Sequence, residues 1–281
     1  AGEEMTTKAY LANGEEPKAI LDEAQRLLMS ISAGGGRNAV RDAKDLGPAT
    51  LKTFEVKCED KNYLNGLSTG FRDPDGWISG LQNSSLYIIA GRPGMGKTAL
   101  GVNILENVVL SGVPAAIFSL EMSSESIMTR ILSSMTGIDS RRLSCGRIPD
   151  SDWPRLVEAT SQISAAPLYV DDSALLNPMQ LRAKARRLKI EKNIGLIVID
   201  YLQLMTGAGR AESREREIAE ISRSLKALAK ELQIPVVALS QLNRAVENRT
   251  IKQPTLADLR ESGAIEQDAD VIIFLYRDEV Y

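Results

Sequence analysis

From Leu86 onward, short apolar runs alternate with longer amphipathic stretches along the chain. The apolar runs are predicted strands at residues 86–90, 115–119, 167–170, 196–200, 235–239 and 271–276. The stretches between them are predicted helices at residues 97–111, 123–136, 152–163, 178–191 and 213–232. This alternation is typical of an α/β fold in which a mostly parallel central sheet is flanked by helices on both faces. In such sheets, ligands bind at the carboxyl ends of the strands.

Closer to the N-terminus, the clearest pattern is a helical stripe of apolar residues. Its members are Ile20, Leu21, Ala24, Leu27, Leu28 and Ile31. They predict an amphipathic helix over residues 17–31, followed by a Gly-rich hinge at 32–36. A helix this short cannot bury its stripe alone, so it either folds back on its own domain or docks on another subunit. We therefore expect a helix with its hinge at residues 1–36 and one domain at residues 37–281.

Composition excludes several classes of site. The 281 residues contain no His, which removes Ser-His-Asp and Cys-His triads and histidine metal sites. The two cysteines, Cys58 and Cys145, are too few for a zinc cluster and predict reduced thiols in a cytoplasmic protein. A net charge of −3 excludes coating of duplex DNA through bulk positive charge, so any nucleic-acid contact must come from local loops. No apolar run approaches the about 18 residues of a membrane span, and no signal peptide begins at Ala1.

The most specific motif is Gly91-Arg92-Pro93-Gly94-Met95-Gly96-Lys97-Thr98, which fits G-x-x-x-x-G-K-[ST]. It follows a predicted strand and opens a predicted helix, which is the context of a phosphate-binding loop. The glycines let backbone N–H groups close around phosphate oxygens, and the helix N-terminus adds a favourable field. In this interpretation Lys97 neutralises the β- and γ-phosphates of ATP, Thr98 offers its hydroxyl to Mg²⁺, and Ala99 completes the nucleotide-binding stretch.

Three polar residues follow other predicted strands. Asp200 ends the apolar run 196–199, where a carboxylate can hold Mg²⁺ and its waters. Glu121 comes just after the strand at 115–119 and suits activation of a water. Gln241 comes just after the strand at 235–239 and suits sensing of the γ-phosphate. Each signal is weak alone, but four strand ends that meet at one edge favour a nucleotide site.

The remaining charged and polar segments predict less. The basic residues of the predicted helix at 178–191 indicate a solvated surface, and Arg214 and Arg216 lie in a mixed-charge helix start with a structural role. Residues 37–82 are polar and loop-rich, with a turn at Asp73-Pro74-Asp75-Gly76. Residues 258–263 lack apolar periodicity and predict a loop that could hold a phosphate through an N–H group and an Arg.

Seven segments in this order resemble the motor domain of DnaB-type replicative DNA helicases. They are residues 91–98, 118–122, 171–172, 199–205, 218–231, 240–244 and 259–270. The resemblance covers about residues 64–281 and, more weakly, the helix at 17–31. It implies a RecA-like P-loop NTPase fold, a homohexameric ring, ATP hydrolysis at subunit interfaces and 5′–3′ translocation on single-stranded DNA. It also identifies the N-terminal helix as a linker helix that docks on the neighbouring subunit, and it implies a helicase loader and primase as partners of the full-length protein.

The resemblance also carries roles over by position. It assigns catalysis to Lys97, Glu121 (the base) and Gln241 (the sensor), Mg²⁺ to Thr98 and Asp200, and single-stranded DNA to Arg260, Glu261 and Gly263. Gly91 and Gly94 replace the usual Ala and Ser, and Pro74 replaces an apolar residue. The family's arginine finger and companion lysine follow the segment that ends at Tyr281, so these residues alone are expected to be a weak ATPase. The primase-interacting domain precedes the matched region, so they are also expected to bind primase weakly.

Two other functions share part of this pattern. A RecA- or RadA-like recombinase has the same phosphate loop but forms an open filament, and the segment 259–270 and the linker helix argue against it. A KaiC-like ring or a helicase-loading adaptor uses ATP to regulate assembly. Only the helicase is expected both to close a six-fold ring and to separate the strands of a forked DNA.

Overall fold

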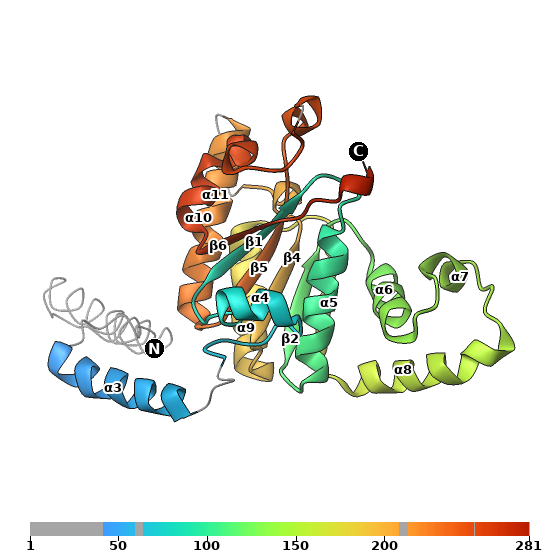
Figure 1. Ribbon diagram of the computed structural model, residues 1–281, viewed down its shortest axis with the longest axis horizontal. Coiled ribbons are helices and arrows are strands. Elements are labelled where there is room, and N and C mark those ends of the chain that lie inside the picture. Colours follow the sequence, from blue (N-terminus) through green and yellow to red (C-terminus); the bar gives the residue numbers. More distant parts are fainter. Residues whose placement is uncertain (1–41, 60–63, 208–212, 250, 281) are drawn as a thin grey trace, which may run out of the picture. The chain divides into compact units, whose positions relative to one another are not determined.

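The computed structural model describes residues 42–59, 64–207, 213–249 and 251–280 (Figure 1). The chain divides into two compact units, Ala1–Tyr63 and Leu64–Tyr281. The helix expected at 17–31 and the hinge at 32–36 lie outside the described residues, so the domain boundary expected at residue 36 stays a prediction. In the first unit the structure describes one helix, α3 (Ala43–Glu59), with Pro48 inside it. The expectation of a loop-rich segment was wrong here, because Gly47-Pro48 and a weak apolar stripe hide a helix from periodicity.

The second unit is built on a six-stranded sheet. Its strands are β1 (Leu86–Gly91), β2 (Ala115–Ser119), β3 (Leu168–Asp171), β4 (Leu196–Asp200), β5 (Val236–Gln241) and β6 (Val271–Phe274). Their order in the sheet is β3-β2-β4-β5-β1-β6, and every pairing is parallel. This confirms the parallel sheet predicted from the sequence. The carboxyl ends of β2, β4, β5 and β1 therefore lie side by side at one edge.

Helices cover both faces of this sheet (Figure 1). The longer ones are α5 (Lys97–Leu110), α6 (Ser124–Thr136), α8 (Trp153–Ala165), α9 (Pro178–Lys192) and α10 (Arg214–Leu232), and the shorter ones are α4 (Arg72–Ile78), α7 (Ser140–Ser144) and α11 (Gly263–Asp268). Leu86, Ile88 and Ala90 of β1 join one apolar core with α9 and α10. Tyr87 and Ile89 join the other core with α5, α6 and α8. Successive strand residues thus point to opposite faces, and both faces are buried.

Two expected loops are helical. The turn predicted at Asp73-Pro74-Asp75-Gly76 forms most of α4, because Pro is tolerated in the first turn of a helix. The loop predicted at residues 258–263 is wrong as well: a 3₁₀ helix, η4 (Leu256–Ser262), runs directly into α11. Short 3₁₀ segments carry no long apolar stripe, so periodicity does not detect them. None of the helices in the described residues is both long enough and apolar enough to cross a membrane.

Asp75 anchors α4 to the segment before it. Its buried carboxylate accepts hydrogen bonds from Ser68 Oγ (2.6 Å), Thr69 Oγ1 (2.7 Å) and the Thr69 N–H (2.9 Å). We expect Asp75→Ala to lower the free energy of unfolding by about 2 kcal/mol, because the donors of the buried Thr69 lose their acceptor. Urea denaturation of the whole chain checks this. The matched control is Asp73→Ala, which removes an exposed acid from the same helical turn; equal losses from both variants would contradict the prediction.

Candidate active site

The phosphate-loop motif connects β1 to α5. Gly94 and Gly96 adopt φ angles of 80° and 96°, in the left-handed region that favours glycine. Gly96 is the N-cap of α5 and has no side chain to occupy the N–H groups of its first turn. The loop therefore leaves backbone donors free around the start of the helix, as binding of a phosphate requires.

The four predicted strand ends meet at this loop. Gly91 lies opposite Gln241 in the β1–β5 pair, and Ser119 lies opposite Asp200 in the β2–β4 pair. A cleft of about 390 Å³ opens there. Its lining residues are Pro93, Gly94, Gly96, Lys97, Thr98, Ala99, Glu121, Met122, Arg130, Asp200, Tyr201 and Gln241. The structure thus brings Lys97, Thr98, Glu121, Asp200 and Gln241 from four segments into one cleft.

Burial and neighbouring groups act in opposite directions on the pKa values of Lys97 and Asp200 in the cleft. Burial lowers the pKa of Lys97, while the nearby Asp200 and Glu121 carboxylates act in the other direction. Burial raises the pKa of Asp200, which is 2% exposed, while a hydrogen bond with Thr98 and the charge of Lys97 partly offset that rise. A cation at Asp200 would stabilise this buried carboxylate further.

This set of donors fits a divalent cation that is shared with a phosphate ligand. Thr98 and Asp200 offer hard oxygen ligands side by side, the type that Mg²⁺ prefers. Among the residues that the structure describes, no group of three or more Cys, Asp or Glu side chains could hold a metal ion. The cation would therefore need further oxygens from water and from the bound phosphates, which is how Mg²⁺ is usually held in nucleotide sites.

Three residues expected to bind nucleotide lie outside the lining of the cleft. Gly91 is buried at the end of β1 and Met95 is buried in the core. The Arg92 side chain is 7% exposed and points to the segment after β5, where Nε pairs with Glu247 at 2.7 Å and Nη1 donates to the Leu242 carbonyl at 2.7 Å. Arg92 thus fixes the phosphate loop to its neighbour, and its carbonyl accepts a hydrogen bond from Lys97 Nζ at 3.1 Å.

The residues expected to bind DNA lie in a segment that follows β5 in the chain. Arg260 and Glu261 belong to η4, and Gly263 begins α11. Both segments pack against α10. Asp258 joins η4 to the segment after β5: it forms an ion pair with Arg249, and its carbonyl accepts from the Asn243 N–H at 3.1 Å. The proposed DNA segment is therefore linked to the chain just beyond Gln241.

Sequence reasoning missed three residues that line the cleft. Arg130 comes from the middle of α6, and its charge acts on Asp200. Nothing in the local sequence separates it from a surface arginine, because only the packing of α6 brings it to the site. Met122 and Tyr201 directly follow Glu121 and Asp200, so the strand-end argument could have found them.

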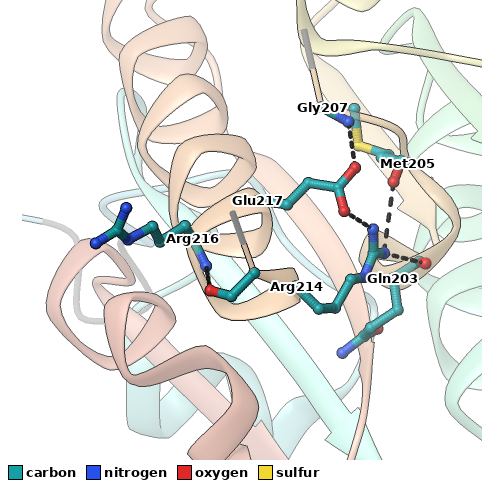
Figure 2. A network of polar contacts seen from close by, with 7 residues as sticks. Gln203, Met205, Gly207, Arg214, Arg216 and Glu217 are labelled. Carbon is teal, nitrogen blue, oxygen red and sulfur yellow. Dashed lines mark hydrogen bonds and ion pairs between the residues drawn. The ribbon is translucent and has the colours of Figure 1, made fainter. Parts of the chain in front are cut away.

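A polar network lies at the start of α10 (Figure 2). Arg214 pairs with Glu217 and donates to the carbonyls of Gln203 and Met205. The Gly207 N–H donates to Glu217 at 2.6 Å and, as the strongest influence, lowers the pKa of that carboxyl. The structural role predicted for Arg214 is confirmed, and α10 begins at this residue with Ser213 as its cap.

Comparison with known proteins shows one consistent relationship. Residues 66–281 match the model of the DnaB-like helicase C terminal domain. The chain is 45% identical over 269 residues to the replicative DNA helicase DnaB of Geobacillus stearothermophilus (95% of this chain, 59% of that protein). It is 47% identical over 292 residues to the replicative DNA helicase DnaB of Pasteurella multocida (99% of this chain, 61% of that protein). The chain thus spans about three-fifths of these curated relatives.

Two solved structures share the fold. One, described as an ATPase domain, superposes with a TM-score of 0.80 at 36% identity, over 85% of this chain and 86% of that one. The other, described as a DnaB-like replicative helicase and its interactions with primase, superposes with a TM-score of 0.78 at 33% identity, over 100% of this chain and 65% of that one. Both likenesses confirm the RecA-like fold expected from the resemblance.

Proposed function

Because the chain belongs to the family of DnaB-like helicase C-terminal domains, we propose that it is the ATP-driven motor of a replicative DNA helicase. The motor hydrolyses ATP between subunits of a homohexameric ring, moves 5′–3′ on single-stranded DNA and unwinds the duplex ahead of it. The observation that carries the proposal is the cleft at the start of α5, which gathers a phosphate loop and the polar ends of three further strands.

In this proposal the phosphate loop binds the triphosphate through its N–H groups and the start of α5. Lys97 lines the cleft within reach of the Asp200 charge and neutralises the β- and γ-phosphates. Thr98 and Asp200 would hold Mg²⁺, which when bound offsets the charge that develops on the phosphate oxygens. Burial of Asp200 supports this role, because the carboxylate can then orient ligands without competing solvent.

Glu121 and Gln241 act at the γ-phosphate. Glu121 is exposed in the cleft, just after the strand next to that of Asp200, where its carboxylate can orient the attacking water and accept its proton. Gln241 ends β5 beside the loop, and its amide can hydrogen-bond to the γ-phosphate and lose that contact after hydrolysis. The Gln241 hydrogen bond is thus present before hydrolysis and absent after it, and this change is the signal for movement.

DNA binding belongs to η4 and the start of α11. An Arg260 guanidinium with backbone N–H groups near Gly263 suits the DNA backbone, so an acidic protein can bind DNA through a local positive field in the ring's channel. The linker helix at residues 17–31 would hold neighbouring subunits together while they move. A helicase loader and primase are the partners that we propose for the full-length protein.

Electron microscopy and a forked-DNA unwinding assay on the full-length protein test the proposal. We expect a closed six-membered ring that separates the strands only with ATP and Mg²⁺. A helical filament on DNA would instead favour a recombinase, and a ring that hydrolyses ATP without unwinding would favour a nucleotide-switch protein.

Arg260 gives a second test of the DNA-binding assignment. We expect Arg260→Ala to weaken binding of a single-stranded oligonucleotide by about 10-fold, because one charged contact to the phosphate backbone is lost. Basal ATP hydrolysis should change less. Fluorescence anisotropy measures the binding, and Arg187→Ala on the exposed side of α9 is the matched control. Unchanged DNA affinity in Arg260→Ala would contradict the assignment of this segment.

A further inference from the structure

The Gln203 side chain holds the backbone of Gln241 on both sides. Its Oε1 accepts from the Gln241 N–H at 3.1 Å, and its Nε2 donates to the Gln241 carbonyl at 3.2 Å. Nε2 also donates to Ser240 Oγ at 2.9 Å, and Ser240 is fully buried. Gln203 lies in the 3₁₀ turn η2 (Leu202–Leu204) after β4, so this contact crosses between the two strand ends that carry Asp200 and Gln241.

The Gln203 main chain makes a separate contact. Its carbonyl accepts from Arg214, the first residue of α10, which in turn pairs with Glu217 (Figure 2). Glu217 closes the network by accepting from the Gly207 N–H. Gln203 therefore contacts Gln241 through its side chain and the start of α10 through its main chain.

The helix reached in this way is the one that supports the proposed DNA segment. α10 packs against both η4 and α11. A second cavity, of about 320 Å³, is lined by residues of α10 and η4 and by the segments at the ends of β4 and β5, among them Gln203, Gln241, Arg214 and Leu259. Gln241 lines both this cavity and the nucleotide cleft. Gln241 is therefore connected to η4 by a chain of contacts through Gln203, Arg214 and α10.

We propose that Gln203 is a positioning residue: it sets the main chain of Gln241 at the γ-phosphate and ties it to the start of α10, so that nucleotide and DNA act on the same element. This inference rests on the proposed function, in which Gln241 senses the γ-phosphate. A glutamine suits the task because its side-chain amide carries both a donor and an acceptor, which match the main-chain carbonyl and N–H of the single residue Gln241. Neither an acid nor an apolar side chain of the same length can make both bonds.

The test compares Gln203→Met with Gln203→Glu in the full-length protein. Met preserves the length and volume of the side chain but makes neither bond. Glu keeps an oxygen that accepts from the Gln241 N–H but cannot donate to the Gln241 carbonyl. The matched control is Gln162→Met, which makes the same exchange at an exposed position of α8. Steady-state ATP hydrolysis is measured over a range of ATP concentrations, with and without a single-stranded oligonucleotide.

We expect Gln203→Met to lower kcat by about 10- to 100-fold, because a small displacement of a positioned group can cost this much, while KM for ATP stays within about twofold. Stimulation by the oligonucleotide should be lost, Gln203→Glu should be intermediate, and Gln162→Met should match the parent protein. Because Gln203 acts through Gln241, the double variant Gln203→Met/Gln241→Ala should be no slower than Gln241→Ala alone.

The possible failures are separable. Parental kcat and parental DNA stimulation in Gln203→Met, beside an impaired Gln241→Ala, would overturn the positioning role and leave the proposed function standing. A double variant slower by the product of the two single effects would also overturn it, since Gln203 would then act independently of Gln241. Full activity in both Gln241→Ala and Lys97→Ala would instead remove the proposed function. If Gln203→Met fails to fold, parental kinetics in Gln203→Glu overturn the inference.

Discussion

Lys97→Ala is expected to abolish ATP hydrolysis, with a fall in kcat of about 1,000-fold or more, because a preorganised cation is removed from the developing phosphate charge. Its position in the cleft, near Asp200 and Glu121, leaves no second lysine to replace it within the lining that the structure describes. Burial lowers the pKa of Lys97 in the free site, so bound phosphates would also stabilise its charged form. A phosphate-release assay on the full-length protein checks the loss.

The fold should survive this substitution. Within the described residues, the Lys97 ammonium makes a single hydrogen bond, to the Arg92 carbonyl, whose loss costs about 1 kcal/mol. Thermal unfolding should therefore remain cooperative and shift by only a few degrees. Lys192→Ala, at the exposed end of α9, is the matched control and should hydrolyse ATP at the parental rate. Residual hydrolysis in Lys97→Ala above a tenth of the parental rate would contradict the role of Lys97.

The sheet could be predicted from the sequence because two signals agreed along it. Each strand is a short apolar run, and the first four of these runs are followed by stretches with a helical period. β2 and β4 match their predicted limits, and β5 extends two residues further, to Gln241 itself. Polar residues at strand ends then met at one edge because all the pairings are parallel.

The rest of the site depends on packing that no local pattern encodes. Arg92 has the same place in the motif whether it faces the phosphates or Glu247, and only the fold of residues 242–247 decides between them. Arg130 reaches the cleft through the packing of α6 on α5. Gln203 was part of a recognised segment, but its bonds to Gln241 join residues 38 positions apart. These are tertiary contacts, so sequence patterns identify only their candidates.

The same distinction applies to the helical segments that were missed. Pro74 and Gly76 favour a turn, yet the carboxylate of Asp75 binds the preceding segment and holds α4 in place. Tertiary hydrogen bonds here outweigh weak local propensity. The 3₁₀ helix η4 is also held by polar contacts and not by an apolar stripe. Asp258 accepts a hydrogen bond from the Thr255 N–H and forms an ion pair with Arg249.

Glu121→Gln should separate binding from chemistry. The amide cannot accept the proton of the attacking water, so kcat is expected to fall by about 100- to 10,000-fold, the usual contribution of a general base. Lys97, Thr98 and Asp200 remain, so affinity for ATP should stay within about threefold of the parent protein. Phosphate release measures the first quantity, and equilibrium binding of a fluorescent ATP analogue measures the second.

The comparison with a neighbouring acid makes this prediction specific. Glu125, exposed in the first turn of α6, lies four positions further along the chain, and Glu125→Gln makes the same chemical change outside the cleft lining. It should hydrolyse ATP at the parental rate. If Glu121→Gln keeps parental hydrolysis, the base must be another group. If Glu121→Gln loses ATP binding together with hydrolysis, Glu121 contributes to binding of ATP rather than to the transition state. The proposed separation of roles, with Glu121 as the base and Asp200 as the Mg²⁺ ligand, is then wrong.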